Sequence, residues 1–313
     1  MRLDRIGVDE SVAAVFPPAR LVDRLADATD EAGVDVTAVD GSPDALADCD
    51  AVVTLEHRET YLDLSWVHSI QAGVDRFPRE RLREGNVVLT NSTGIHGDAV
   101  GETVAGFVLA LARRIHEYAA AQTDSEWTRP DWDEAWTVAG ERACVVGIGG
   151  LGRGIVDRLT GLGLDVDGVR RTPVPEPGVD RVYTTDRLRE VIGDARFVVL
   201  AVPLTDATRG SIGRDELAAM DDEAYLINVA RGGVVDQSAL VAALRDDEIA
   251  GAALDVFETE PLPADSPLWD LEDVIVSPHC AAYTRDYYRH VSEIVTESVR
   301  RIADGDEPVN RVV

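Results

Sequence analysis

The chain has 313 residues, enough for two domains with separate cores, and its 45% hydrophobic content is ordinary for a globular protein. Its formal net charge of −28 is not ordinary, and it disfavours nucleic acid and anionic membranes as partners because both would repel it. All 30 basic residues are arginine, and the lack of lysine excludes Schiff-base chemistry and a P-loop.

An acidic surface without lysine resembles that of proteins from a highly saline cytoplasm. At molar salt the Debye length is only about 3 Å, so the self-repulsion of this charge is largely screened. The composition therefore predicts a halophilic source and a loss of stability at low salt.

The cysteines and the N-terminus indicate the compartment. Cys49, Cys144 and Cys280 are odd in number and lack CxxC spacing, which argues against a disulfide framework or a zinc site. The first residues, Met1 to Arg5, contain no apolar signal region, and no apolar run approaches the ~18 residues that span a bilayer. We expect a cytoplasmic protein without a metal.

The first part of the chain predicts a parallel sheet followed by a long helix. Three short apolar runs separated by connecting segments are expected as buried strands: Ala51–Leu55, Trp66–Ile70 and Val87–Thr90. Apolar residues at helical spacing predict one helix from Asp98 to about Ala119. The polar stretch from Gln122 to Gly140 is expected to be a connection whose three tryptophans, Trp127, Trp132 and Trp136, serve packing.

A glycine-rich motif then predicts a dinucleotide site. The run Val145-Val146-Gly147-Ile148-Gly149-Gly150-Leu151-Gly152 leads from a strand through G-x-G-x-x-G into a helix-like segment, Arg153 to Leu162. The first glycine permits a tight turn, the second lets the backbone approach a pyrophosphate, and the third lets the helix pack on the strand. The helix N-terminus then holds the negative charge.

The residues about 23 positions after Gly147 predict which cofactor binds. An NAD site carries an acidic residue there to accept hydrogen bonds from the ribose, but this chain has Arg170, followed by Arg171 and Thr172. Two guanidinium groups and a hydroxyl suit a 2′-phosphate, so we expect a preference for NADP(H) with NAD(H) as the alternative. Asp167 would be the acidic residue if its strand ended early.

The second half of the chain has the alternation of strands and helices that is typical of a doubly wound α/β sheet. Seven apolar runs are expected as strands, with helices such as Ser238–Arg245 between most of them. They are Cys144–Val146, Leu164–Val169, Val182–Tyr183, Phe197–Ala201, Tyr225–Val229, Gly251–Asp255 and Val274–Ser277. The segment Arg285–Ala303 predicts a last helix, with Tyr288, Val291, Val295 and Val299 on one face.

Three segments place charged groups just past predicted strands, where α/β sheets bind ligands. They are Asn228 to Gly233, Asp255 to Pro261 and Ser277 to His279, and they supply an arginine, a carboxylate and a histidine. Such a set can bind a substrate carboxylate, polarise the adjacent carbonyl and donate a proton to its oxygen as hydride arrives at carbon. A carboxylate beside the histidine orients it and favours its charged form.

Taken together, these motifs resemble those of the D-isomer-specific 2-hydroxyacid dehydrogenase family. The resemblance covers nearly the whole chain and also includes Ala72-Gly73-Val74-Asp75 and Val202-Pro203-Leu204-Thr205. It implies two doubly wound parallel-sheet α/β domains with a cleft between them. The substrate domain would comprise residues 1–97 and 284–313, and a Rossmann-type cofactor domain, 98–283, would be inserted into it.

The resemblance also implies roles for individual residues. Arg231, Glu260 and His279 would be catalytic, with Arg231 and the backbone amides of Ala72 and Gly73 binding the substrate. Glu260, rather than Glu258, would be the partner carboxylate because it directly precedes Pro261. The cofactor site would comprise the glycine motif, the arginine segment and positions after later strands: Gly147, Gly149, Gly150, Leu151, Gly152, Arg170, Arg171, Thr172, Val202, Pro203, Thr208, Val229, Ala230 and Asp255.

The implied activity is reversible reduction of a 2-keto acid to the D-2-hydroxy acid with NADPH, in a homodimer. Glyoxylate or hydroxypyruvate reductase is the alternative within the family. A dinucleotide-sensing protein, similar to the C-terminal-binding protein corepressors, is the alternative outside enzymes. The helix from Asp98 and the tryptophan-bearing connection are the candidate dimer contacts.

Overall fold

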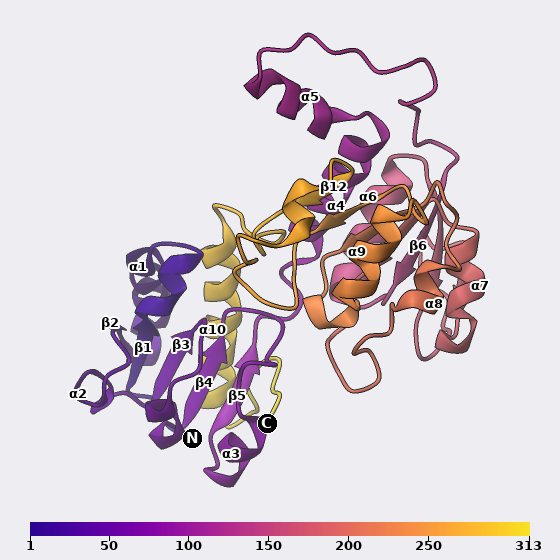
Figure 1. Ribbon diagram of the computed structural model, residues 1–313. Coiled ribbons are helices and arrows are strands. Elements are labelled where there is room, and N and C mark those ends of the chain that lie inside the picture. The colour runs from indigo at the N-terminus through magenta and orange to yellow at the C-terminus, as the bar shows by residue number, and fades with distance from the viewer. The chain divides into compact units, whose positions relative to one another are not determined.

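The computed structural model describes residues 1–313 and divides into two compact units (Figure 1). Unit 1 combines Met1–Ile95 with Tyr283–Val313, and unit 2 is His96–Ala282. Each unit is built on one parallel sheet, so the predicted fold class of two parallel-sheet α/β domains is confirmed. The substrate role expected for residues 1–97 and 284–313 stays a prediction.

Unit 1 contains a five-stranded parallel sheet in the order β2-β1-β3-β4-β5. Its strands are β1 (Arg5–Asp9), β2 (Asp35–Val39), β3 (Ala51–Thr54), β4 (Trp66–Ser69) and β5 (Val88–Asn91). Its helices are α1 (Pro18–Thr29), α2 (Pro43–Leu46), α3 (Arg79–Glu84) and α10 (Tyr287–Ala303), with 3-10 turns at Glu10–Ala14, Asp30–Ala32 and Glu59–Asp63. The predicted strands correspond to β3, β4 and β5, whereas β1 and β2 were not among them.

The C-terminal segment completes unit 1. Helix α10 packs against α1, where Arg24 Nε donates to Ser292 Oγ at 2.8 Å, and the two helices lie side by side in Figure 1. The buried ring at the start of α10 is Tyr287, not Tyr288, and its hydroxyl donates to the carbonyl of Ile70 at 2.8 Å. Residues of the first and last parts of the chain therefore share one core.

Unit 2 contains a seven-stranded parallel sheet in the order β12-β11-β10-β9-β6-β7-β8. Its strands are β6 (Arg142–Val146), β7 (Asp165–Val169), β8 (Arg181–Tyr183), β9 (Phe197–Leu200), β10 (Tyr225–Asn228), β11 (Gly251–Leu254) and β12 (Val274–Val276). Its helices are α4 (Gly97–Ala112), α5 (Ile115–Thr123), α6 (Gly150–Gly161), α7 (Leu188–Gly193), α8 (Arg214–Leu217) and α9 (Gln237–Arg245), with 3-10 turns at Thr185–Arg187, Gly232–Val234 and Pro267–Asp270. The strand order reverses at β6, which makes the end of β6 a topological switch point.

Alternate residues of these strands serve different cores. Cys144 and Val198 belong to one apolar cluster, whereas their neighbours Val145 and Val199 belong to the other. Side chains on a strand alternate between the two faces of the sheet, so a strand covered on both sides reads as one continuous apolar run. This is why the sequence pattern found the strands of unit 2 well.

Helices α4 and α6 touch through their backbones. A Cβ atom added to Gly154 would lie 2.0 Å from the carbonyl oxygen of Gly97, and one added to Gly101 would lie 2.3 Å from that of Gly154. Only glycine fits at such distances, so these residues set how closely the two helices approach. The helix that carries the glycine motif is thereby held firmly against α4.

The single helix predicted from Asp98 to Ala119 is wrong, because the chain breaks it into α4 and α5. Arg114 adopts a left-handed conformation with φ of 55°. Its guanidinium forms an ion pair with Glu117 and donates from NH1 to Asp273 Oδ1 at 3.1 Å. A contact with a residue 159 positions away thus overrides the local helical pattern. His116, Glu117 and Asp273 lie close enough together to hold a metal ion. Both carboxylates of this group are, however, paired with the guanidinium of Arg114.

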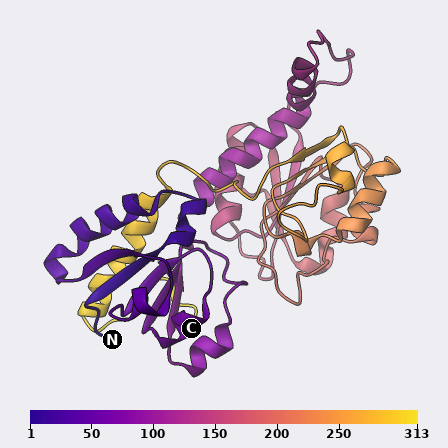
Figure 2. The same ribbon diagram turned by 60° about the vertical axis from the view of Figure 1, so that its left-hand side comes forward.

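Helix α5 and the chain after it form an arm that projects from the rest of unit 2 in both ribbon views (Figures 1 and 2). No residue of α5 is buried. Trp127 and Trp132 are 90% and 93% exposed, so the expectation that they pack is wrong for this chain. Trp136 does pack, since it stacks on Tyr225 with ring centroids 5.8 Å apart.

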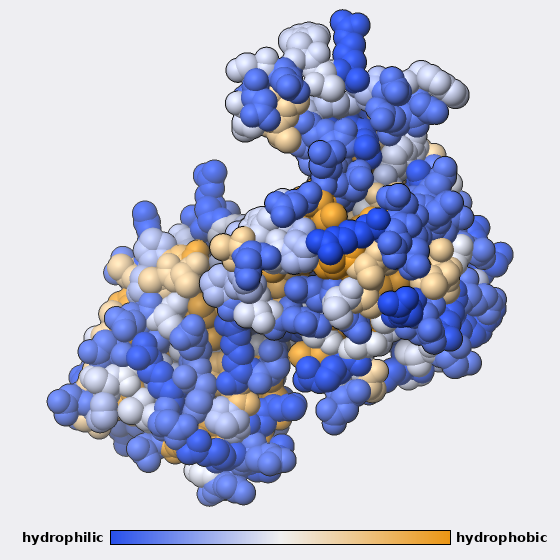
Figure 3. Space-filling model, viewed as in Figure 1, coloured by the Kyte–Doolittle hydropathy of each residue, from blue (hydrophilic) through white to orange (hydrophobic).

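Hydrophilic residues cover most of the surface visible in Figure 3. No helix combines the length and the apolar character that crossing a bilayer would require. All three cysteines are free thiols, with Cys144 buried and Cys49 and Cys280 half-buried.

Candidate active site

The glycine motif forms the turn between β6 and α6. Gly147 has φ of +99°, and a Cβ atom there would lie 2.6 Å from the carbonyl oxygen of Ala201. A Cβ atom on Gly152 would lie 2.0 Å from the carbonyl oxygen of Gly147, so the third glycine lets the helix approach the turn. Helix α6 begins at Gly150, within the motif and three residues earlier than the sequence suggested.

The space in front of this turn suits a pyrophosphate. Cβ atoms added to Gly149 and Gly150 would meet no atom within 4 Å. No side chain caps α6, and the amides of the first turn of a helix have no acceptor within the helix. Open space, free amide donors and the positive end of the helix dipole together fit the phosphates of a dinucleotide.

The arginine segment directly follows β7. The side chain of Arg170 is 27% exposed, and its NH1 lies 3.3 Å from Glu176 Oε2. Arg171 and Thr172 are exposed in the loop that follows. Asp167 is only 6% exposed within β7, which continues to Val169, so the alternative in which this strand ends at Asp167 is wrong. Burial raises the pKa of its carboxyl group.

The other expected cofactor positions follow β9 and β10. Val202 and Pro203 come just after β9, where Thr208 Oγ1 donates to the carbonyl of Pro203 at 2.6 Å and ties the loop into a turn. Val229 and Ala230 come just after β10 and are 5% and 3% exposed. These segments all leave the carboxyl edge of the same parallel sheet, as the glycine turn does.

His279 and Glu260 are brought together by this edge of the sheet. His279 Nδ1 lies 2.7 Å from Glu260 Oε2, although the residues are 19 positions apart. The side chains are 25% and 24% exposed. The other carboxylate oxygen of Glu260 accepts from the amide of Phe257 at 3.1 Å, which fixes the carboxylate.

Arg231 lies on the loop after β10, next to the loop that bears Glu260. Asn228 shapes the Arg231 loop by donating from Nδ2 to the carbonyl of Arg231 at 3.2 Å. A Cβ atom on Gly232 would lie 1.9 Å from the carbonyl carbon of Phe257, so the two loops touch backbone to backbone. The glycine after Arg231 is therefore required by this close backbone packing.

Asp255 holds the loop that carries His279. It is 2% exposed, and its Oδ1 accepts from Ser277 Oγ at 2.6 Å and from the amide of Cys280 at 2.9 Å. Its Oδ2 accepts from the amide of Ala281 at 3.0 Å. The sequence pointed to Asp255 as a cofactor contact but gave no sign of this scaffolding of the histidine loop.

Ala72 and Gly73 belong to unit 1, where they follow the carboxyl end of β4 and are half-buried. Asn91 Nδ2 donates to the carbonyl of Ala72 at 2.6 Å, which fixes the turn. The turn is thereby tied to the end of the neighbouring strand β5.

Comparison with known proteins gives a consistent result. The family model described as "D-isomer specific 2-hydroxyacid dehydrogenase, NAD binding domain" matches residues 105–281. This chain belongs to the D-isomer specific 2-hydroxyacid dehydrogenase family. It is therefore an oxidoreductase, and unit 2 contains its NAD-binding domain.

Members of this family from several organisms are similar to the chain. A glyoxylate reductase from Korarchaeum cryptofilum is 33% identical over 281 residues, which are 85% of this chain and 83% of that protein. A D-3-phosphoglycerate dehydrogenase from Methanocaldococcus jannaschii is 34% identical over 244 residues, and the chain spans only 46% of its length. The crystal structure of a family member from Xanthobacter autotrophicus Py2, in complex with NADPH and MES, has a TM-score of 0.79 at 33% identity and 98% coverage of both chains.

Proposed function

We propose that this dehydrogenase reduces a 2-keto acid to the D-2-hydroxy acid with NADPH, in a reversible reaction in the cytoplasm. The observation that carries the proposal is the hydrogen-bonded pair of His279 and Glu260 at the carboxyl edge of the cofactor-binding sheet. An imidazole held at one nitrogen by a carboxylate presents its other nitrogen for proton transfer.

Arg231, Glu260 and His279 each have a separate task in this proposal. Nε2 of His279 donates a proton to the substrate carbonyl oxygen. A nicotinamide cofactor bound at this edge of the sheet would supply the hydride to the carbon. Glu260 orients the imidazole and stabilises the positive charge that it carries before donation. Arg231 binds the substrate carboxylate and polarises the carbonyl, with the amides of Ala72 and Gly73 as further donors.

The preference for NADPH rests on Arg170. A guanidinium at the end of β7 attracts a 2′-phosphate, and no acidic residue follows the strand directly to accept hydrogen bonds from a ribose. Arg171 and Thr172 extend the polar surface around it. The bound NADPH in the similar Xanthobacter structure supports this choice.

A spectrophotometric assay tests the activity. NADPH oxidation should depend on an added 2-keto acid, and a chiral product, such as that from pyruvate or hydroxypyruvate, should have the D configuration. Pyruvate, hydroxypyruvate and glyoxylate form a useful panel, since several similar proteins are named glyoxylate reductases and glyoxylate as the best substrate is the second candidate. Tight NADPH binding without turnover on any keto acid would instead favour a dinucleotide sensor.

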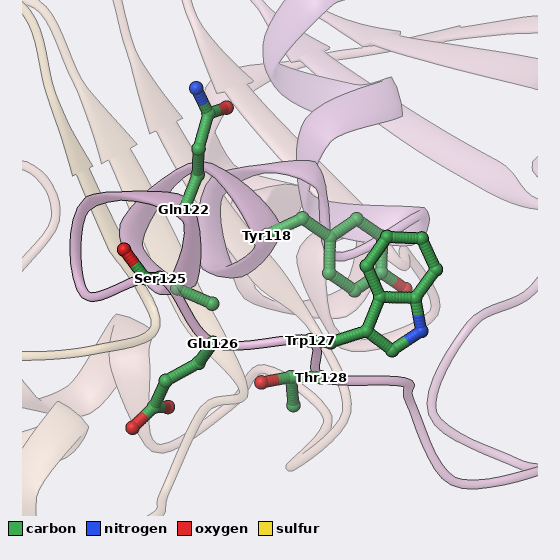
Figure 4. Close-up of a pocket in the computed structure, with 7 residues that line it drawn as sticks. Tyr118, Gln122, Ser125, Glu126, Trp127 and Thr128 are labelled. Atoms are coloured by element: carbon green, nitrogen blue, oxygen red, sulfur yellow. The ribbon is translucent and has the colours of Figure 1, made fainter.

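We also propose that the enzyme is a homodimer in which the arm of unit 2 contacts a second copy. A nine-residue helix without buried residues is marginal in water, and α5 is such a helix. Beside it lies a hollow of 440 Å³ lined by Tyr118, Ala121, Gln122, Ser125, Glu126, Trp127 and Thr128 (Figure 4). Exposed tryptophans beside a hollow are typical of protein interfaces.

Sedimentation of the intact protein tests the dimer. Wild type should sediment as a dimer at micromolar concentration, and the double variant Trp127→Ala with Trp132→Ala should shift toward the monomer. Trp269→Ala is the matched control, because Trp269 is 51% exposed but lies outside the arm. A monomeric wild type would remove the dimer from the proposal.

The charge of −28 leads us to propose a halophilic source. The Debye length grows from about 3 Å at 1 M salt to about 10 Å at 0.1 M, so the acidic groups repel one another more strongly in dilute buffer. Dialysis from molar salt to 0.1 M should therefore lower the melting temperature and the activity. Unchanged thermal unfolding at 0.1 M salt would contradict the proposal.

A further inference from the structure

A carboxylate lies between two arginines where the 2′-phosphate of the cofactor is expected. Arg153, in the first turn of α6, donates to Glu176 from Nε at 2.8 Å and from NH2 at 3.2 Å. Arg170, after β7, donates to Oε2 of the same carboxylate from NH1 at 3.3 Å. Both oxygens of Glu176 are thus engaged by guanidinium groups that come from the glycine-motif helix and from the ribose-reading position.

The loop that bears Glu176 is constrained by its sequence. Prolines 173, 175 and 177 alternate with the residues around Glu176, and each proline fixes its own φ angle. The carbonyl of Glu176 accepts from the amide of Val179 at 3.1 Å. A Cβ atom on Gly178 would lie 3.0 Å from Val156 Cγ1, so the loop packs against α6. The carboxylate is therefore presented to the arginines by a stiff segment.

The carboxylate of Glu176 is largely shielded from solvent, so its contacts with the two arginines are not those of an exposed surface ion pair. Its side chain is 13% exposed, against 27% for Arg170 and 60% for Arg153. The hydrogen bond from Arg153 lowers the pKa of the Glu176 carboxyl group, with Arg170 adding to this effect. The group is therefore an anion at neutral pH, and the two guanidiniums already surround a negative charge.

We propose that Arg153 joins Arg170 in binding the 2′-phosphate of NADPH, and that Glu176 competes with this phosphate for both guanidiniums. The proposal rests on the proposed use of NADPH. A phosphate monoester carries nearly two negative charges at pH 7 and accepts the bidentate geometry that a carboxylate accepts. It must therefore displace the carboxylate or share the arginines with it.

This competition sets the ratio of the affinities for the two dinucleotides. NADPH binding includes the cost of breaking contacts between Glu176 and the arginines, whereas NADH, which lacks the 2′-phosphate, leaves these contacts in place. A free ribose hydroxyl of NADH can in addition donate to the Glu176 carboxylate. Glu176 therefore narrows the preference for NADPH that the two arginines create.

Calorimetric titration of NADPH and NADH into the intact protein tests the proposal without relying on turnover. In Glu176→Gln the ratio of the NADH to the NADPH dissociation constant should rise by about tenfold, mainly through tighter NADPH binding, since a charge-assisted contact is worth about that much. Arg153→Ala and Arg170→Ala should each weaken NADPH binding by about tenfold or more and change NADH binding by less than about threefold.

Glu190→Gln is the matched control, because Glu190 pairs with Arg187 at 2.8 Å on α7 and its loss removes the same charge elsewhere in unit 2. It should leave the ratio unchanged. If the arginine variants lose NADPH but Glu176→Gln leaves the ratio unchanged or lowers it, the competition is refuted while the NADPH site stands. If wild type and both arginine variants bind the two dinucleotides alike, the proposed NADPH preference itself fails.

Discussion

Two histidines of this chain meet opposite surroundings at their parallel sheets. His68 lies within β4 of unit 1 and is fully buried, with Nδ1 2.8 Å from Thr90 Oγ1 and Nε2 3.0 Å from Ser92 Oγ. His279 follows β12 of unit 2, is partly exposed and pairs with the carboxylate of Glu260. The ring of His68 is enclosed and bonded to neutral hydroxyls. The ring of His279 is partly exposed and faces the charged carboxylate of Glu260.

The contrast shows that position relative to the end of the strand decides what a histidine can do. Burial lowers the pKa of His68 to about 3, because hydroxyl partners do not offset the charge of an imidazolium. Both of its nitrogens are used in holding β4 to β5. His279 lies beyond its strand, so it keeps one nitrogen for chemistry.

The largest expected effect comes from removing the open histidine. His279→Ala should lower kcat for keto-acid reduction by about 10²- to 10⁴-fold, the usual contribution of a positioned general acid, and should leave the NADPH dissociation constant unchanged. Steady-state kinetics and titration of NADPH measure the two quantities. His290→Ala is the control, because His290 is exposed on α10. Turnover close to wild type would remove His279 from the mechanism.

A smaller effect should follow when the partner of His279 is made neutral, as the partners of His68 are. Glu260→Gln keeps an acceptor for the amide of Phe257 but removes the charge beside the imidazole. We expect kcat to fall by about 10- to 100-fold, since a hydrogen bond to a charged group is worth about 1.5–3 kcal/mol. Glu258→Gln provides the comparison, because Glu258 is exposed two residues away. Equal losses in both variants would undermine the choice of Glu260.

The closed histidine should affect stability and its pH dependence rather than turnover. An unfolded chain binds a proton at His68 below about pH 6.5, but the native protein binds none until about pH 3. Acidification through this window therefore favours unfolding, by about 1.4 kcal/mol for each pH unit.

His68→Gln should remove this pH dependence of the free energy of unfolding. At pH 8 the variant should be less stable by about 1–3 kcal/mol, because two buried hydroxyls lose part of their hydrogen bonding. The difference should shrink toward pH 5 as wild type loses its advantage. Denaturant unfolding at several pH values in high salt measures this difference in stability. Burial also lowers the pKa of His57, but His57 contributes equally to wild type and to His68→Gln. A difference that stays constant with pH would show that His68 is protonated when folded.

Much of unit 2 could be predicted because its signals are local. A strand covered on both faces is a continuous apolar run, and the turn from β6 to α6 needs glycine where the backbone itself blocks a side chain. Arg231 and His279 could be singled out because each follows such a run directly. The edge strand β2, with Asp35, Thr37 and Ala38 at least partly exposed, lacks this signal and was not predicted.

The features that the sequence did not predict depend on distant partners. The break at Arg114 involves Asp273, and the pairing of Glu176 joins a loop to two different elements. Trp127 and Trp132 read as packing residues, but nothing in their own chain buries them. The periodicity of apolar residues shows which face of a segment is buried. It does not show which distant charged residue, or which second molecule, contacts that segment.

The split of unit 1 between the two ends of the chain has a consequence for synthesis on the ribosome. Unit 2 is continuous, so it can fold as soon as its last strand emerges. Unit 1 must wait for α10 to cover α1 and for Val312 to donate to the carbonyl of Leu89 at 2.7 Å. The nascent N-terminal sheet therefore stays without its covering helix while nearly two hundred further residues are added. Synthesis of unit 1 therefore begins before that of unit 2, but its fold is completed after that of unit 2.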